Sequence, residues 1–414
     1  MSRDVEQPLP TAGPVAARAP TRRRQRLTSL AGALVLFGTN AVVGLAIARR
    51  LGPAGRGEIT YAFLLMSIGS TVAAFGLDHA ATRVLAPQLH PSRKDLRRIL
   101  GLAAASGALV AVVVTVGSLL LREPLNAPAV LVGVLAYTLA QVGAPAALAC
   151  GLVRQVAAVR LVAGCGYLVA SLVALYAGVW PGWLVWTWVA AGLLLGLAMF
   201  GLAWRRTAAG TARVAPYSVL LRIGRTGWQS SLAQIITYRM DQVVVLAVAG
   251  AAPLGQYSIA VFGMSSLWLV ADSTGELEYP AGTRLDAVGR RSQARRIGAK
   301  VTLVVGALAL LEVALAPLLV RPVLGEGYGQ VPLLLLLLLP GTVANAAAKV
   351  TSAALFSGGR GAHVRTAVFC TAAVVAVLTV PVVRLFGVVG AATLSSAVYT
   401  LLAVLVWTAL HRRA

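Results

Sequence analysis

Apolar segments long enough to cross a membrane recur from one end of this chain to the other. Of its 414 residues, 58% are hydrophobic and only 12% are charged, and the mean hydropathy is +0.81. A helix needs about 20 apolar residues to span a bilayer, and in lipid only helices and closed barrels satisfy their backbone hydrogen bonds. The short alternating segments of a β-barrel do not occur in the sequence. We therefore predict an all-α integral membrane protein with about twelve spans, placed near 28–48, 58–80, 99–121, 129–152, 157–178, 182–204, 226–249, 255–277, 299–320, 331–355, 364–384 and 388–410.

Basic residues alternate in density along the chain, which carries a net charge of +23. Of the 36 Lys and Arg residues, 29 fall in the two terminal segments and the even-numbered connections, whereas six fall in the odd-numbered ones. Because Lys and Arg accumulate on the cytoplasmic side of membrane proteins, this bias predicts an even number of spans with both termini cytoplasmic. The basic residues are not interleaved with aromatic residues in a soluble region, so we expect no nucleic-acid partner.

One stretch of the chain occurs twice. Residues 51–78, a glycine-rich turn followed by a long apolar helix, match residues 249–276 after a shift of 198 positions. A repeat of about half the chain predicts two similar halves around a pseudo-two-fold axis, with the substrate between them. The turn falls on the outer side, where its glycines are expected to let the first and second spans, and the seventh and eighth, pack as tight hairpins. The identical positions of the first copy are Gly52, Ala54, Gly57, Ala62, Met66, Ser67, Val72 and Ala73.

A basic connection at 205–225 separates two sets of six spans. Each set begins and ends on the same side, which is typical of a parallel repeat about an axis along the membrane normal. We predict the following organisation: a disordered basic cytoplasmic tail at 1–27, an N-terminal six-helix bundle at 28–204, a cytoplasmic linker at 205–225, a C-terminal six-helix bundle at 226–410 and a cytoplasmic tail at 411–414.

Polar residues within the seventh span are the first candidates for a site, because ionisable groups in hydrocarbon usually face a cavity or a partner. Gln234, Tyr238 and Asp241 are spaced by four and three residues and so share one face of a helix. Arg239 lies about 200° round the helix from Asp241. It is expected to pair with an acid of the eighth span or to line the cavity itself, where it would contact an anion.

The eighth, tenth and first spans supply further cavity candidates. Asp272 has two interpretations, a cavity role or a structural salt bridge. Together with Asp241 it is a candidate for coupling to a proton or sodium gradient. Lys349 is a second cation inside a span. Asn40 either lines the cavity or only forms hydrogen bonds between helices.

Two acids occupy equivalent positions of the repeat near the predicted cytoplasmic face. Asp78 ends the first copy and Glu276 ends the second. We expect them to form gating ion pairs with Arg83 or Arg284 in preference to acting as transport sites.

Signals of catalysis are lacking. The four histidines are scattered near the inner surface, and Cys150, Cys165 and Cys370 lie inside apolar segments without metal-ligand spacing. The sequence contains no phosphate-binding loop, no HExxH and no GxSxG motif. We expect no catalytic residue, metal or cofactor, so the chain is not predicted to be an enzyme.

Several longer motifs resemble a known family. ARRLGPAGRGEITYAF and AFGLDHAATRVLA in the first half are similar to the opening of the polysaccharide-transporter family, which belongs to the multidrug/oligosaccharidyl-lipid/polysaccharide (MOP) flippase superfamily. O-antigen flippases and lipid II flippases are related to it. The resemblance covers nearly all of 28–410. In the second half it is carried by YRMDQVVVLAVAGAAPLGQYSIA, APLLVRPVLGEGYGQ, LFSGGR and FGVVGAATLSSAVYTLL.

The resemblance implies two six-helix bundles that form a V around a central cavity. It also implies a flippase of the bacterial inner membrane that moves undecaprenyl-pyrophosphate-linked glycans from the inner to the outer leaflet by alternating access, alongside glycan-assembly proteins. Lipid II flippases carry arginines deep in the first bundle, whereas this first span has none between Thr28 and Ala48. Positive charge for a pyrophosphate is therefore expected from Arg239, Arg160 or Lys349, which favours another isoprenoid-linked glycan over lipid II.

Two alternatives to this function are open at the level of sequence. One is a drug/cation antiporter of the same superfamily, which would exchange cations for protons or sodium. The other is a membrane scaffold of a glycan-assembly complex that does not transport.

Overall fold

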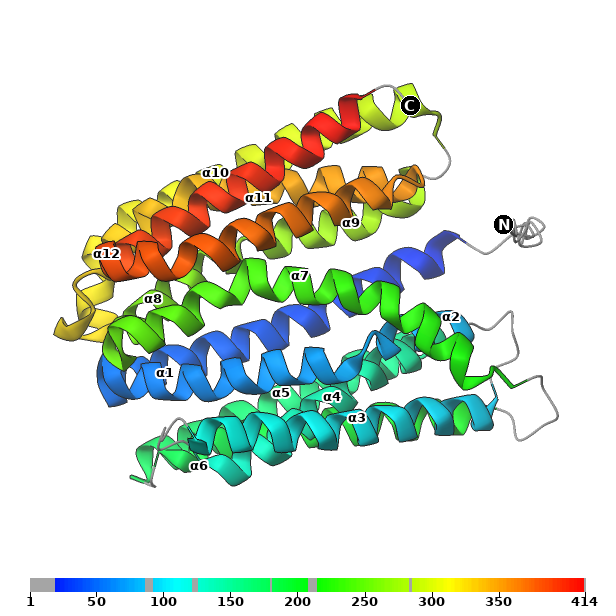
Figure 1. The fold of residues 1–414 in the computed structure, drawn as a ribbon, viewed down its shortest axis with the longest axis horizontal. Coiled ribbons are helices and arrows are strands. Elements are labelled where there is room, and N and C mark those ends of the chain that lie inside the picture. Colours follow the sequence, from blue (N-terminus) through cyan, green and yellow to red (C-terminus); the bar gives the residue numbers. More distant parts are fainter. Residues whose placement is uncertain are drawn as a thin grey trace.

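The computed structural model describes residues 19–85, 92–120, 126–178, 181–207, 214–282 and 285–412, which form helices joined by short turns (Figure 1). The helices are α1 (Ala19–Ala74), α2 (Leu77–Val84), α3 (Arg93–Leu120), α4 (Ala127–Ala149), α5 (Val153–Tyr176), α6 (Gly182–Arg206), α7 (Tyr217–Ala249), α8 (Ala251–Ser266), α9 (Trp268–Gly282), α10 (Ala287–Leu324), the short 3₁₀ helix η2 (Glu326–Tyr328), α11 (Val331–Ser357) and α12 (Gly361–His411).

Twelve spans result from these elements, as the sequence predicts. The described residues contain ten helical stretches that are long and apolar enough to cross a membrane. Two of them, in α1 and α12, each hold two helices merged across a non-helical glycine, Gly52 and Gly387. Positive φ angles of 69° and 59° at these glycines reverse the chain direction within each stretch. The fold class predicted from the sequence is confirmed.

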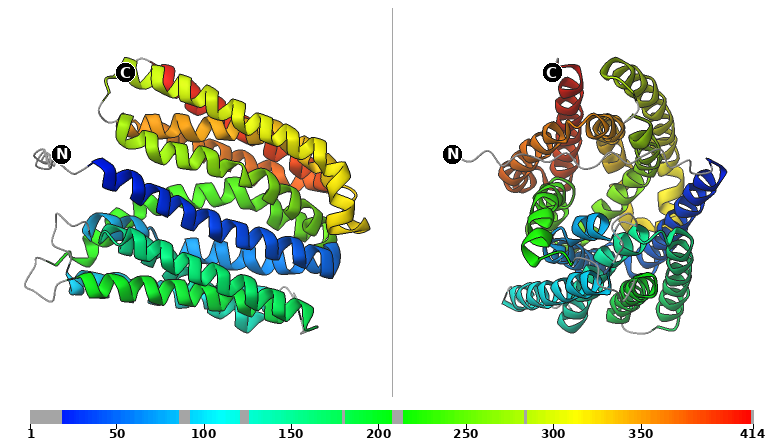
Figure 2. Two further views of the ribbon diagram at one scale, coloured as in Figure 1. Left: turned by 180° about the vertical axis from the view of Figure 1, so that it is seen from behind. Right: turned by 90° about the vertical axis from the view of Figure 1, so that its right-hand side faces the viewer.

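The chain is arranged as two helical halves, with α1 to α6 on one side and α7 to α12 on the other (Figures 1 and 2). The described part of α1 begins, and α12 ends, at the same end of the molecule, here called the terminal end (Figure 1). The turns within α1, between α7 and α8 and within α12 lie at the opposite end, here called the hairpin end (Figure 1); they contain Gly52, Gly250 and Gly387. The two halves diverge toward the terminal end (Figure 1). Large apolar side chains such as Leu109 and Leu303 are exposed on the outer surface, as expected next to lipid.

Repeat-related residues form the contact between the halves at the hairpin end. A methyl group on Gly57 would overlap the carbonyl oxygen of Ala251, and one on Gly255 would overlap the carbonyl oxygen of Pro53. These two contacts are equivalent under the shift of 198 residues. Thr60 Oγ1 donates a hydrogen bond to Ser258 Oγ at 3.3 Å, and these residues are also 198 positions apart. The pseudo-two-fold axis therefore passes close to this hydrogen bond.

This contact corrects the role predicted for the repeated glycines. Gly52 and Gly250 do form the hairpin turns, with φ angles of 69° and 95°. Gly57 and Gly255, however, pack α1 against α8 across the two halves and not within each hairpin. The reason is that each lies one helical turn beyond its hairpin, on the side of the helix that faces the other half.

Three further interactions hold the halves together. At the hairpin end, Arg49 Nη1 donates to the carbonyl oxygen of Pro322 at 2.7 Å, and Tyr328 OH donates to that of Ala48 at 3.1 Å. Nearer the terminal end, Trp228 Nε1 donates to the carbonyl oxygen of Val72 at 2.9 Å. The helix of the second span breaks just beyond Val72, at Phe75 and Gly76, and continues as α2.

Several helices begin earlier than the predicted boundaries, and α10 does so by twelve residues, at Ala287. α1 begins at Ala19, so the last part of the predicted tail is helical, while residues 1–18 lie outside the described residues. α7 begins at Tyr217, after Pro216, and continues into the seventh span without a break. The second part of the linker predicted at 205–225 is therefore the first part of this helix, because Pro216 precedes the first helical residue. The division into domains stays a prediction.

We expect Gly255→Ala to weaken the contact at the hairpin end, because the added methyl would overlap the Pro53 carbonyl. Overpacking of this kind costs about 1–3 kcal/mol, so the thermal unfolding midpoint in detergent should fall. Gly201→Ala is the matched control, since nothing lies within 4 Å of the methyl it adds. Equal midpoints for the two variants would contradict the predicted effect.

Candidate functional site

A cavity of about 280 Å³ lies between the two halves and is called here the central cavity. Both arms of α1, together with α7 and α8, supply most of its wall. Its lining residues are Phe37, Asn40, Gly44, Arg56, Thr60, Phe63, Leu64, Ser67, Tyr167, Trp188, Arg239, Gln242, Ser258, Val261, Phe262 and Ser265. None of these residues is acidic, and two are arginines.

Arg56 is the most buried charge in this cavity, with 8% of its surface exposed. Its Nε atom is buried and has no hydrogen-bond partner, and Arg56 forms none of the ion pairs found among the described residues. Its Nη1 atom lies 3.3 Å from the position that a methyl group on Gly44 would take. Glycine at that position therefore leaves room for the guanidinium group.

Sequence reasoning placed Arg56 in the outer connection, and the structure corrects this. The turn is confined to Gly52, and the helix resumes at Pro53, which has the fixed φ of a first helical residue. Arg56 therefore lies in the first turn of the second span and reaches the cavity. The signal that could have located it is the Gly-Pro pair, after which the helix resumes at Pro53, five residues before the predicted start at 58.

Arg239 and Asn40, two of the candidates named from the sequence, both line the central cavity. Arg239 is on α7, and its side chain is exposed. Gln242, three residues along the same helix, also lines the cavity, and its Nε2 atom is buried without a hydrogen-bond partner. Arg160, the cation expected from the first half, is not among the residues that line this cavity.

Aromatic rings surround the polar groups. Phe37 of α1 stacks on Phe262 of α8, with ring centroids 4.9 Å apart and planes inclined by 5°. Phe63 packs against Trp188 of α6, with centroids 4.2 Å apart. The central cavity therefore combines cationic groups with flat apolar surfaces.

An apolar groove of about 490 Å³ adjoins the central cavity. Arg56, Gly44 and Phe262 line both spaces. The rest of the groove is formed mainly by leucines and valines of α10 and α11, with Glu312 of α10 as its acid. A molecule in this groove would thus have an apolar environment next to the arginine of the central cavity.

Four of the predicted site residues line a different cavity, which lies within the second half. They are Gln234, Tyr238, Asp272 and Lys349. This C-terminal cavity has a volume of about 520 Å³ and is lined by Gln234, Tyr238, Ala271, Asp272, Gly275, Asn345, Ala348, Lys349, Ser352, Ala353, Phe356, Val364, Val368 and Leu402. The single cavity expected from the sequence is therefore two cavities, separated by α7. Tyr238 and Arg239 are adjacent in sequence but line different ones, because successive residues point about 100° apart on a helix.

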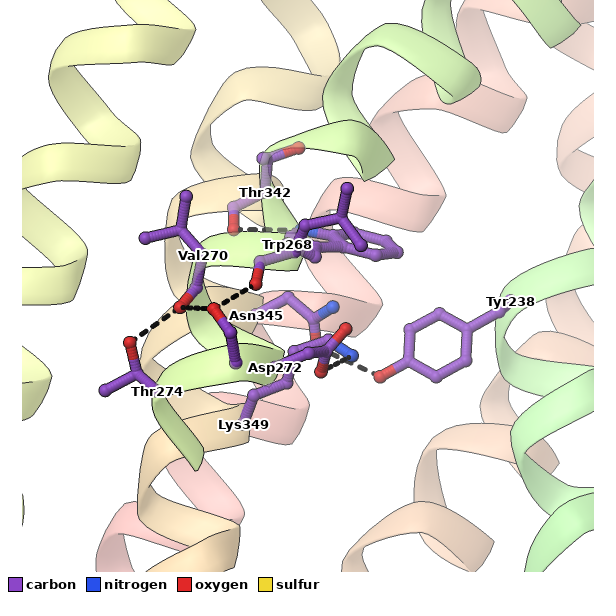
Figure 3. Close-up of polar contacts among 10 residues, drawn as sticks. Tyr238, Trp268, Val270, Asp272, Thr274, Thr342, Asn345 and Lys349 are labelled. Atoms are coloured by element: carbon purple, nitrogen blue, oxygen red, sulfur yellow. Dashed lines mark hydrogen bonds and ion pairs between the residues drawn. The ribbon is translucent and has the colours of Figure 1, made fainter. Parts of the chain in front are cut away.

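An ion pair joins α11 to α9 in the C-terminal cavity. Lys349 Nζ donates to Asp272 Oδ1 at 2.6 Å and lies 5.7 Å from the centre of the Trp268 ring. Tyr238 OH donates to Asn345 Oδ1 at 3.0 Å (Figure 3). Asp272 therefore forms a salt bridge and also lines a cavity. The sequence had suggested a salt bridge or a cavity position as alternatives, and the structure shows both.

Asp241 lies apart from both cavities. It is 4% exposed and accepts hydrogen bonds from Tyr257 OH at 2.5 Å, from Ser395 Oγ at 2.8 Å and from the backbone N–H of Gln242 at 2.7 Å. It was predicted to share a face with Tyr238, but three residues correspond to about 300° of rotation. The side chain of Asp241 therefore points about 60° away from that of Tyr238. It faces α8 and α12, and its hydrogen bonds with Tyr257 and Ser395 link these helices to α7.

The predicted gating pair in the first half is not formed. Asp78 lies 3.8 Å from Nε2 of His79, and Arg83 forms no ion pair among the described residues. Both are on α2, five residues apart and so about 140° round the helix, which points their side chains away from each other. The pair expected in the second half lies outside the described side chains, since neither Glu276 nor Arg284 is placed.

Comparison with known proteins supports the fold. A family model described as "Polysaccharide biosynthesis protein" matches residues 46–331. The lipid II flippase MurJ, in an inward closed conformation, has a TM-score of 0.67 at 10% identity over 95% of this chain and 87% of that one. An inward-facing multidrug resistance MATE family transporter of the MOP superfamily gives 0.62 at 15% identity over 91% and 93%. A MOP superfamily transporter from Pyrococcus furiosus gives 0.54 at 15% identity over 94% and 96%.

Comparison with curated protein sequences gives no match. The structural likenesses, at these identities, concern the fold. Together with the family match they confirm the resemblance read from the sequence motifs.

We expect Tyr257→Phe to lower the thermal stability of the protein, because it removes a donor from the buried Asp241 carboxylate. Loss of a hydrogen bond to a buried charged group costs about 1.5–3 kcal/mol. Thermal unfolding in detergent measures the effect, with Tyr176→Phe as control because Tyr176 is 65% exposed. If both variants unfold at the same temperature, Asp241 is not held as described.

Proposed function

The chain belongs to the polysaccharide biosynthesis protein family, and we propose that it is a membrane transporter that flips a lipid-linked oligosaccharide or polysaccharide precursor. The substrate class is an isoprenoid-linked glycan with an anionic phosphate or pyrophosphate head, of the undecaprenyl type. Movement runs from the inner to the outer leaflet of a bacterial inner membrane, by alternating access, with both termini cytoplasmic. No catalytic step is part of this function.

One observation carries the proposal: two arginines line the central cavity and no acid does. Arg56 and Arg239 come from opposite halves of the molecule. An isolated buried charge is costly, and Arg56 has a buried Nε without a partner. An oxyanion that entered between the halves would pair with both guanidinium groups, which suit phosphate geometry.

The surroundings of the arginines fit the other parts of such a substrate. Sugar rings pack on flat apolar surfaces, and Phe37, Phe262 and Trp188 offer these in the cavity wall. An isoprenoid chain needs an apolar path, and the groove beside Arg56 opens next to the cavity. The head group can therefore sit between the halves while the lipid chain stays in an apolar environment.

The same electrostatics argue against the drug/cation antiporter. A carboxylate would favour a cationic ligand, but none lines the central cavity, and Arg56 and Arg239 would repel a cation there. Among the three cavities described, acidic residues line the adjoining groove, with Glu312, and the C-terminal cavity, where Lys349 already neutralises Asp272. Coupling to a proton or sodium gradient belongs to the proposal, with Asp272 as the coupling candidate, because Asp241 is held inside the helix packing.

We expect Arg56→Gln and Arg239→Gln each to slow translocation of an undecaprenyl-pyrophosphate-linked glycan in proteoliposomes by about 10-fold or more, since each removes a charge-assisted hydrogen bond. Arg321→Gln is the control, because Arg321 is an exposed arginine at the hairpin end that pairs with Glu326 and such pairs contribute little. Wild-type rates for both cavity variants would rule out the anion site.

Alternating access requires the contact at the hairpin end to open. In a background without the three native cysteines, a disulfide between Thr60→Cys and Ser258→Cys should stop translocation, because the hydroxyl oxygens at these positions are 3.3 Å apart. Reduction of the disulfide should restore the rate. Full activity of the cross-linked protein would show that the halves need not separate there.

A further inference from the structure

The C-terminal cavity contains more polar groups than the helix packing around it uses. Tyr238 and Asn345 share one hydrogen bond, and Lys349 forms an ion pair with Asp272 (Figure 3). The cavity volume of about 520 Å³ lies within the range of small-molecule sites, roughly 300–1,000 Å³. None of these four residues lines the central cavity, so the anion site proposed above does not account for them.

The floor of this cavity holds a donor that lacks an acceptor. Asn345 is completely buried, and its Oδ1 atom accepts from Tyr238 OH at 3.0 Å. Its Nδ2 atom has no hydrogen-bond partner among the described residues. Buried polar groups in native proteins are nearly always paired, so this amide indicates that a ligand oxygen enters the cavity.

Gln234 and Ser352 add free polar groups to the wall. Gln234 on α7 is exposed, and Ser352 on α11 is half-buried. Neither side chain forms a hydrogen bond with another of the described residues. An amide and a hydroxyl group each offer both a donor and an acceptor, so this part of the wall suits a ligand that donates as well as accepts.

The ion pair determines the charge of the ligand. Asp272 Oδ1 accepts from Lys349 Nζ at 2.6 Å, and no other charged residue lines the cavity, so there is no excess charge to attract an ion. Lys349 keeps N–H donors and Asp272 keeps its Oδ2 acceptor, on side chains that are 25% and 49% exposed. A donor and an acceptor side by side match two adjacent hydroxyl groups of one uncharged molecule.

Aromatic rings complete the wall. Tyr238 and Phe356 line the cavity, and Phe356 is 49% exposed. Trp268 lies beside the ion pair, with its ring centre 5.7 Å from Lys349 Nζ. The C–H face of a sugar ring can pack on flat apolar surfaces of this kind, while its hydroxyl groups need the donors and acceptors described above.

We propose that the C-terminal cavity is a carbohydrate-binding site for one uncharged sugar ring. Hydroxyl groups of the sugar bind Lys349 and Asp272 together, and a sugar oxygen accepts from the Nδ2 atom of Asn345. As a step in transport the inference rests on the proposed function. Because α7 separates this cavity from Arg56 and Arg239, the sugar held here is one remote from the phosphate.

Saturation-transfer NMR on the purified full-length protein measures the binding of free sugars. The probes are methyl glucoside, methyl galactoside and N-acetylglucosamine. The detergent is a polyoxyethylene ether, because the head groups of maltoside detergents are themselves sugars. We expect transfer to the ring protons of at least one probe, and absence of transfer to all three would overturn the proposal.

A double substitution tests where the sugar binds. Asp272→Leu/Lys349→Met replaces the ion pair by apolar side chains of similar size, an exchange that is often neutral for stability. It should weaken sugar binding roughly 10-fold or more, because the hydrogen bonds to the pair are lost. Arg321→Met/Glu326→Leu is the matched control, since it removes an ion pair at the hairpin end and should leave sugar binding unchanged.

Retained binding by the cavity variant would place the sugar elsewhere and overturn the proposal. Thermal unfolding midpoints close to that of the wild type show that both double variants are folded. Ser352→Phe is a further test, because it leaves the ion pair in place and fills the cavity, so it should also abolish sugar binding. Undiminished binding by this variant would equally overturn the proposal.

Competition defines the class of the ligand. Glycine betaine, a zwitterion, and sulfate, an anion, should not displace the sugar, because each would have to break the ion pair; displacement by either would overturn the proposal. If the sugars bind as expected but the glycan lipid is not translocated, the proposed function fails and the sugar site stands. If the glycan lipid is translocated while no sugar binds, the sugar site fails and the proposed function stands.

Discussion

The contact between α1 and α8 at the hairpin end is the constraint on which the rest of the structure depends. Gly57 and Gly255 bring the backbones of the two halves together, each against a carbonyl group of the other half. Without a hydrophobic driving force between helices in lipid, close backbone packing at small residues is a main source of association. Because the halves meet here and diverge toward the terminal end, the space between them is closed on one side. The central cavity is a consequence of this geometry.

Charged residues within the helices lie in the central cavity between the halves, in the C-terminal cavity and in the packing around Asp241. The central cavity has cations from both halves and no acid among its lining residues. The C-terminal cavity contains the ion pair of Lys349 with Asp272, and the buried Asp241 is held by three hydrogen bonds within the helix packing. Charges in a membrane protein are usually paired or functional. Of the three places, the central cavity is the one lined by cations without an acid among its lining residues, which favours it for the anionic head group proposed above.

The fold was predictable to a large extent because its signals are periodic and local. Apolar length located the spans, and the repeat of 198 residues located the axis, near which Thr60 and Ser258 form a hydrogen bond. The site was less predictable because it depends on helix rotation and on where a turn ends. Arg56 was missed since one glycine completes the turn, and Asp241 was misplaced since 60° of rotation separates it from Tyr238. No spacing rule could show that α7 divides one expected cavity into two.

This division gives α7 a central place in any coupling between the two cavities. Arg239 on one face lines the central cavity, while Tyr238, the preceding residue, lines the C-terminal cavity and donates to Asn345. A rigid helix cannot rotate one face without moving the other. A rotation of α7 that altered the hydrogen bond of Tyr238 with Asn345 would therefore also shift Arg239 relative to Arg56, and the reverse would hold by thermodynamic reciprocity. The two cavities need no direct passage between them to influence each other, because they share a wall.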